Sequence, residues 1–181
     1  MSISVVTIDF WNTLVDSSGG DGRNRQRAEV LIAEAKKLGV DLTIEQVQAS
    51  GENAWAFFRQ HWLELVRTPL THEMVDHIWN ELEIPDDAEA KKRVEQVYAR
   101  GIVDHPPALL PGVSEALSRL ADQFTLGIVS DTAISPGIYL KEVLDNYGVL
   151  KHFTHFSFSD ETGVAKPDRK AFDTILTAAD A

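Results

Sequence analysis

The sequence contains no cysteine. Disulfide bonds, thiolate nucleophiles and zinc sites built from cysteine are therefore excluded, and the redox compartment is left open. Residues 1–8 also lack a basic stretch, and their apolar run is too short for a signal peptide or a membrane span. We therefore expect a cytoplasmic protein without a membrane partner.

Positive charge is scarce in this chain. It carries 17 Lys and Arg against 28 Asp and Glu, which gives a net charge of −11. Such a field repels nucleic acid and anionic membrane surfaces, so we expect neither as a partner. A small anionic substrate needs only a local positive site, built from a few basic side chains, main-chain N–H groups or a metal ion. The composition carries no signal for an oligomeric state.

Three short segments have the β-branched and aromatic composition of buried strands: residues 3–8, 124–129 and, less strongly, 153–158. Each ends abruptly in polar residues. Helical periodicity is found in residues 114–121, 139–147 and 169–178. Strands that alternate with helices predict an α/β protein with a parallel, Rossmann-like sheet. Because ligands bind outside the carboxyl ends of such strands, the polar residues that follow them should converge.

The connection between the first two strands, residues 9–123, is far longer than a simple crossover requires. Helical periodicity recurs within it, in residues 25–38, 43–66, 72–81 and 86–100. We therefore expect an all-helical domain, residues 17–106, inserted into a discontinuous α/β core made of residues 1–16 and 107–181. The segments S-S-G-G (17–20) and H-P-P (105–107) are the expected linkers.

Four segments around these strands carry distinctive residues: V-V-T-I-D-F-W-N-T-L-V (5–15), L-P-G-V (110–113), I-V-S-D-T (128–132) and S-D-E-T-G-V-A-K-P-D (159–168). Singly, each has an ordinary explanation, since an Asp after a strand caps a turn, a Ser caps a helix and a Lys is solvated. Together, in this order and spacing, the segments resemble the motifs of the haloacid dehalogenase (HAD) superfamily. The resemblance identifies the insert as a helical cap.

The resemblance implies a role for each matching residue. Asp9 corresponds to the nucleophile, which attacks the substrate and forms a covalent aspartyl intermediate that water hydrolyses. Ser130 corresponds to the hydroxyl that hydrogen-bonds the transferred group, and Lys166 to the catalytic positive charge. Thr13 and Asp131, from the first and second motifs, become candidate substrate contacts.

The resemblance also implies a Mg²⁺ cofactor, held by Asp9, the main-chain carbonyl of Trp11 and an acid of a fourth motif. That motif should follow the helix of residues 169–178 as an acidic strand end, but the sequence stops at Ala181. We therefore expect the C-terminal part of the core, including one metal ligand, to be missing. Asp160 and Glu161 are expected to be solvated loop acids rather than replacements.

Trp11 departs from the pattern of the superfamily's phosphatases, which carry a second Asp at this position to protonate the leaving group. An indole cannot do this, and the loss of positioned acid–base help costs about 10²–10⁴-fold in rate. Haloacid dehalogenases accept an aromatic residue here, because a halide leaves without a proton, and phosphonate-cleaving relatives also lack the second Asp. Three functions follow: hydrolysis of a small phosphorylated or other anionic metabolite, carbon–halogen hydrolysis, or a catalytically silent protein that binds a ligand or partner.

The helical insert offers two further candidate groups. Arg23 and Arg27 would share a helix face if their helix begins early enough, and dehalogenases use a cap arginine to hold the substrate carboxylate or halide. They are therefore candidate substrate contacts, although a solvated helix start is the favoured interpretation. The aromatic residues of the second helical segment have a spacing that favours packing within the bundle over lining a pocket: Trp55, Phe57, Phe58 and Trp62.

Overall fold

The computed structural model describes residues 3–179. Its sheet has three parallel strands in the order β1-β2-β3, with β1 at Val5–Ile8, β2 at Thr125–Ser130 and β3 at His155–Phe158. Val5 pairs with Thr125, and Gly127 pairs with His155. All three predicted strands are therefore present, with ends shifted by one or two residues, and the predicted parallel pairing is confirmed.

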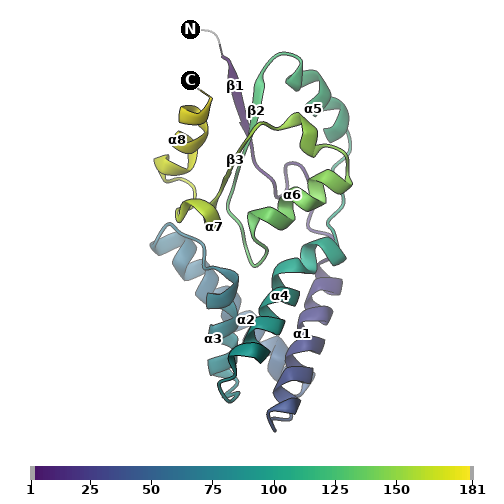
Figure 1. Ribbon diagram of the computed structural model, residues 1–181, viewed down its shortest axis with the longest axis vertical. Coiled ribbons are helices and arrows are strands. Elements are labelled where there is room, and N and C mark those ends of the chain that lie inside the picture. The colour runs from purple at the N-terminus through teal and green to yellow at the C-terminus, as the bar shows by residue number, and fades with distance from the viewer. Residues whose placement is uncertain (1–2, 180–181) are drawn as a thin grey trace.

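Helices cover both faces of the sheet, which explains why β2 reads as a nearly continuous apolar run. The helices α5 (Val113–Ala121) and α6 (Gly137–Asn146) lie on one side, and α8 (Arg169–Ala178) lies on the other (Figure 1). Alternate residues of β2 enter the two resulting clusters. Leu126 and Ile128 pack with α5 and α6, whereas Val129 packs with α8. The helices on both faces thereby hold the three parallel strands, whose carboxyl ends lie at one edge of the sheet.

Two short elements flank β3. The 3₁₀ turn η1 (Leu150–His152) precedes it, and the helix α7 (Ser159–Thr162) follows it directly. The sequence predicted a loop after β3, so the helix α7 differs from that prediction. Its side chains explain it: Thr162 Oγ1 donates to the carbonyl of Phe158 at 3.1 Å, and Gly163 adopts the left-handed conformation that ends the helix.

The long connection between β1 and β2 folds as four helices: α1 (Gly20–Lys37), α2 (Ile44–Glu64), α3 (Thr71–Glu81) and α4 (Ala88–Asp104). All four were predicted, although α1 begins at Gly20 rather than at Arg25. Thr43 forms a capping box with Gln46 at the start of α2, and the Asp87 side chain caps α4. We call α1–α4 the helical insert.

The helical insert has a hydrophobic cluster of its own, whose fully buried members include Leu31, Met74, Trp79 and Val94. α1 packs against α4, and α3 packs against both α4 and α2. In Figure 1 the insert lies beneath the α/β core, at the end of the sheet where the strands terminate. Among residues 3–179, no helix has the length and apolarity that crossing a membrane requires. The predicted domain limits at residues 16–17 and 106–107 stay a prediction.

Gly137, at the start of α6, provides a test of core packing. A Cβ added there would overlap the ring of Phe158, which is fully buried at the end of β3. Gly137→Ala should therefore lower the free energy of unfolding by about 1–3 kcal/mol. Gly51→Ala is the matched control, because a Cβ at this position inside α2 meets no atom within 4 Å. It should raise stability by up to about 1 kcal/mol. Urea denaturation measures both, and equal midpoints for the two variants would contradict the packing.

Candidate active site

Polar residues from three separate segments meet at the carboxyl ends of the strands. Asp9 directly follows β1, Ser130 ends β2 with Asp131 next to it, and Lys166 lies in the segment between α7 and α8. A cavity of about 750 Å³ opens beside them. Its walls come from the core and from the helical insert, and its lining includes Asp9, Trp11, Asp131, Lys166, Arg23, Arg27, Trp55, Phe58 and Trp62. The predicted convergence is therefore observed.

The Asp9 carboxylate is held by two donors on one oxygen. Lys166 Nζ lies 2.9 Å from Asp9 Oδ1, and the main-chain N–H of Phe10 donates to the same oxygen at 2.8 Å. Lys166 Nζ also donates to the carbonyl of Val129 at 3.4 Å. Among the described residues no donor engages Asp9 Oδ2.

Trp11 lines the cavity two residues after Asp9, where an acid would be needed to protonate a leaving group. Its ring packs edge-on against Phe10, with centroids 5.2 Å apart, and the Arg23 guanidinium lies 5.8 Å from the indole centroid. A cation, rather than an acid, therefore lies beside Trp11.

Arg23 and Arg27 are not solvated, so the favoured interpretation of this helix start was wrong. Because α1 begins at Gly20, both side chains turn toward α4, where they are only 8% and 9% exposed. Arg23 Nη1 donates to the carbonyl of His105 at 2.7 Å, and Arg27 Nη2 donates to that of Tyr98 at 3.3 Å. Burial lowers the pKa of Arg27 to about 10, so it stays charged at neutral pH. Neither arginine forms an ion pair with a carboxylate of residues 3–179.

Two predicted site residues do not line the cavity. Thr13 is exposed, after the left-handed Asn12. Ser130 is only 1% exposed, and its Oγ has no hydrogen-bond partner among the described residues. An unpaired buried hydroxyl costs about 1–3 kcal/mol, so the Ser130 hydroxyl is a polar group in need of a partner.

The aromatic residues of α2 divide between packing and the cavity. Phe57 stacks on His77 with centroids 4.5 Å apart, as the packing interpretation expects. That interpretation was wrong for Trp55 and Trp62, which line the cavity, and Phe58 does both. Sequence periodicity shows that these residues lie on a helix but not which element they face.

Trp62 also links the helical insert to the core. Its Nε1 donates to Asp131 Oδ2 at 3.0 Å, and Asp131 Oδ1 accepts the main-chain N–H of Lys166 at 2.9 Å. Both carboxylate oxygens of Asp131 are thus engaged within the protein. Sequence reasoning missed this contact because it joins residues far apart in the chain, and no local pattern marks it. Substrate contacts by Asp131 and by Thr13 stay predictions.

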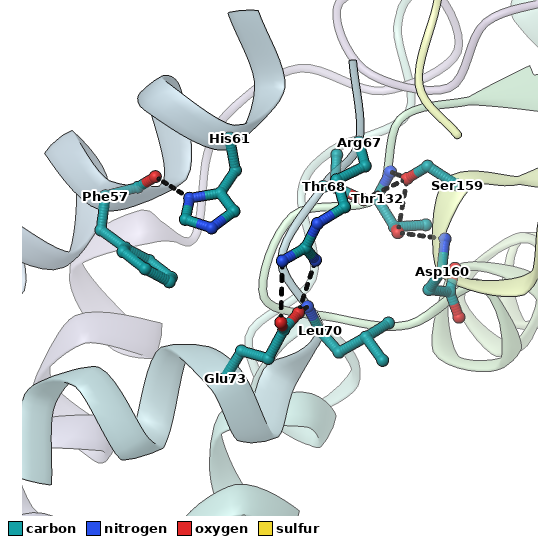
Figure 2. Close-up of polar contacts among 9 residues, drawn as sticks. All are labelled: Phe57, His61, Arg67, Thr68, Leu70, Glu73, Thr132, Ser159 and Asp160. Atoms are coloured by element: carbon teal, nitrogen blue, oxygen red, sulfur yellow. Dashed lines mark hydrogen bonds and ion pairs between the residues drawn. The ribbon is translucent and has the colours of Figure 1, made fainter. Parts of the chain in front are cut away.

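The connection between α2 and α3 provides a second contact with the core (Figure 2). Thr68 Oγ1 and Ser159 Oγ are 2.5 Å apart, and Ser159 Oγ accepts the main-chain N–H of Thr132 at 2.8 Å. Nearby, the Ala165 N–H donates to the carbonyl of Val66 at 2.7 Å. Residues 66–68 therefore contact the segment that carries Lys166.

The same connection contains a two-bond ion pair. Arg67 donates to both oxygens of Glu73, at 2.7 and 2.9 Å, and Glu73 also accepts the N–H of Leu70 (Figure 2). The hydrogen bonds from Arg67 lower the pKa of Glu73 to about 2. This pair holds the connection to the start of α3.

Glu73→Gln removes the charge but keeps an oxygen that can accept the Leu70 N–H. The wild type should be more stable at pH 7 by about 1 kcal/mol or less, because both side chains are partly exposed. The folded-state pKa lies below the unfolded value of about 4.3, so this stability is present above that pH. It is lost as the pH falls toward 2. Chemical denaturation at several pH values measures the difference, and a constant difference down to pH 2 would contradict this origin.

The described residues only partly fit the implied Mg²⁺ site. Asp9 and Trp11 follow β1 at the carboxyl ends of the strands, which is the edge of the sheet where the ion is expected, but a third ligand is needed. Asp160 accepts the N–H of Gly137 at 3.1 and 3.2 Å, so the expectation of a solvated loop acid was wrong, and Glu161 lies 3.8 Å from Lys141 Nζ. Within residues 3–179, no three His, Cys, Asp or Glu side chains are grouped to hold a metal ion. These residues alone do not complete a magnesium site.

Comparison with known proteins agrees with this geometry. The model of the haloacid dehalogenase-like hydrolase family matches residues 3–180. An uncharacterized hydrolase of Schizosaccharomyces pombe is 23% identical over 98% of this chain and 74% of its own.

Two solved structures share the fold. The 2-haloacid dehalogenase of Pseudomonas syringae pv. tomato has a TM-score of 0.68 at 20% identity, over 99% of this chain and 74% of that one. The HAD-hydrolase YfnB of Bacillus subtilis, bound to magnesium, has a TM-score of 0.61 at 20% identity, over 98% and 73%. At this identity the likeness shows the fold, and it confirms the predicted fold class.

Proposed function

Because the chain belongs to the haloacid dehalogenase-like hydrolase family, and so is a hydrolase, we propose that Asp9 is its nucleophile and that its substrate is a small anionic molecule. The observation that carries the proposal is the contact of Asp9 with Lys166 in a cavity that also receives two buried arginines. Asp9 forms a bond to the substrate, the leaving group departs, and water hydrolyses the resulting aspartyl intermediate.

Lys166 and Ser130 support this chemistry from the core. The Lys166 ammonium lies 2.9 Å from Asp9 Oδ1, so it is placed to stabilise negative charge that develops at the reacting centre. The buried Ser130 hydroxyl lacks a partner among the described residues, which fits a donor reserved for the transferred group. Ser130 is the last residue of β2, whereas Lys166 lies in the segment between α7 and α8.

Arg23 and Arg27 support an anionic substrate from the helical insert. A buried guanidinium without a carboxylate partner is costly, and a bound anion removes that cost. The two arginines share one face of α1 and the same cavity as Asp9. We therefore assign them to the negative charge of the substrate, both that of an unreacting anionic group and that of a group leaving beside Trp11.

Substitution of the nucleophile tests the reaction. Asp9→Asn in the full-length protein should lower kcat on the best substrate by at least about 10³-fold, because the amide is a poor nucleophile. Small phosphate esters and 2-halocarboxylic acids form the substrate panel, each assayed with Mg²⁺ and with EDTA. The control is Asp173→Asn, an acid on α8 that pairs with Arg169 outside the cavity. Turnover that survives Asp9→Asn would refute the role of Asp9, and a wild type that binds these anions without turnover would indicate a silent member.

Carbon–halogen hydrolysis is the second candidate, and Trp11 favours it. The indole supplies no proton, and Arg23 places positive charge beside it. A halide leaves as a stable anion, so this arrangement suits its departure. The aromatic lining by Trp55, Phe58 and Trp62 also suits a small organic acid better than a strongly hydrated phosphate.

Isotope labelling separates the two candidates through the bond that water attacks. An aspartyl ester formed on carbon is hydrolysed at the carboxyl carbon of Asp9, so one oxygen from water enters Asp9. A phosphoaspartate is hydrolysed at phosphorus, so that oxygen appears in the phosphate. In a single turnover in ¹⁸O-water, mass spectrometry of the peptide that contains Asp9 should show one heavy oxygen for carbon–halogen hydrolysis. An unlabelled peptide with labelled phosphate would reject this candidate in favour of ester hydrolysis.

A further inference from the structure

Lys166 owes its position to the helical insert as well as to the core. We propose that Trp62, Asp131 and Val66 are positioning residues that hold the Lys166 segment against Asp9 when the helical insert lies as it does here. The inference rests on the proposed function, because it concerns how the catalytic lysine is placed. Three sets of contacts carry it, and they reach the segment at Ala165, at Lys166 and at the start of α7.

The first contact is direct. The Ala165 N–H donates to the carbonyl of Val66 at 2.7 Å. Val66 has a φ of 51°, in the left-handed region that a β-branched residue rarely adopts. The N–H groups of Leu65 and Arg67, on either side of it, both donate to the carbonyl of His61. The surrounding turn thus holds an unfavourable backbone conformation that directs the Val66 carbonyl at the core.

The second contact runs through Asp131. One carboxylate oxygen accepts the Lys166 N–H at 2.9 Å, and the other accepts the indole N–H of Trp62 at 3.0 Å. Two consecutive N–H groups, those of Ala165 and Lys166, are therefore bound either by the helical insert or by a side chain that the insert holds. Trp62 is 37% exposed, and its ring also lies 6.3 Å, centroid to centroid, from that of Phe58.

The third contact lies at the beginning of the segment. Thr68 and Ser159 join their hydroxyl groups in a buried position, and Ser159 also binds Thr132 just after β2 (Figure 2). The N–H of Asp160 donates to Thr132 Oγ1 at 3.2 Å. Both ends of the connection from β3 to Lys166 are consequently attached to the turn between α2 and α3.

These contacts have a consequence for catalysis. A movement of the helical insert away from the strand ends breaks the contacts of Val66, Trp62 and Thr68 together, and Lys166 loses the supports that place its ammonium 2.9 Å from Asp9. A substrate that touches both Asp9 and the arginines of α1 favours the arrangement in which the supports are made. Substrate binding thereby assembles the catalytic pair.

Amide hydrogen exchange tests the coupling without relying on activity. Trp62→Phe removes the indole N–H and keeps an aromatic ring. The matched control is Trp55→Phe, which changes another cavity-lining tryptophan that makes no hydrogen bond to Asp131. NMR of the protein without substrate should show several-fold faster exchange of the Lys166 N–H in Trp62→Phe, as the weakening of one hydrogen bond predicts. Trp55→Phe should leave that rate unchanged.

A second variant tests whether the change in exchange arises from the hydrogen bonds of Asp131 or only from the loss of the Trp62 indole. In Asp131→Asn the amide nitrogen must face one of the two N–H donors, so one hydrogen bond is lost and Lys166 exchange should rise. Adding Trp62→Phe to Asp131→Asn should then give less than the sum of the separate effects. Exchange at Lys166 that is the same in wild type and Trp62→Phe, or fully additive effects, would overturn the proposal.

Steady-state kinetics links the coupling to the reaction. Trp62→Phe should lower kcat by roughly tenfold with a smaller change in KM, because a misplaced lysine affects the reacting centre more than binding. A loss confined to KM would overturn the positioning role. The two proposals fail separately: faster Lys166 exchange in a protein without turnover supports the coupling and refutes the proposed reaction. Normal Asp9-dependent turnover with unchanged exchange refutes the coupling alone.

Discussion

The contact between Lys166 Nζ and Asp9 Oδ1 is the constraint on which the rest of the site depends. The two residues come from opposite ends of the chain, and they meet because β1 and β3 are parallel and end at the same edge of the sheet. Both side chains are partly exposed, so their attraction adds little to stability. The contact instead orients the Asp9 carboxylate. It holds Oδ1, and no donor among the described residues binds Oδ2.

Charge distribution connects this pair with the helical insert. In a chain with a net charge of −11, an anionic substrate is attracted only where cations are concentrated. Lys166 provides one cation from the core, and Arg23 and Arg27 provide two from α1. The arginines reach the cavity because α1 starts directly after the linker, beside the carbonyl of His105 that receives Arg23. The linker geometry therefore decides which cations of α1 reach the cavity.

The parts of the site that the sequence predicts are those encoded locally. An abrupt change from apolar to polar residues marks the end of β1 and of β2, so Asp9 and Ser130 could be placed in advance. Lys166 was found through its motif. The environments of Arg23 and Trp62 could not be predicted, because helical periodicity says which residues share a face and nothing about the element opposite. The link from Trp62 to Asp131 depends on the packing of the whole insert against the core.

Trp11 and Arg23 together limit the kind of leaving group more than either residue does alone. An Asp in place of Trp11 would lie close to the guanidinium that now covers the indole. That positive charge would lower the pKa of the acid and make it a poorer proton donor. The cation is thus matched to the residue that is present, because an indole does not act as the acid that a nearby positive charge would weaken. The neighbourhood of Asp9 therefore suits substrates whose leaving group is already stable when charged.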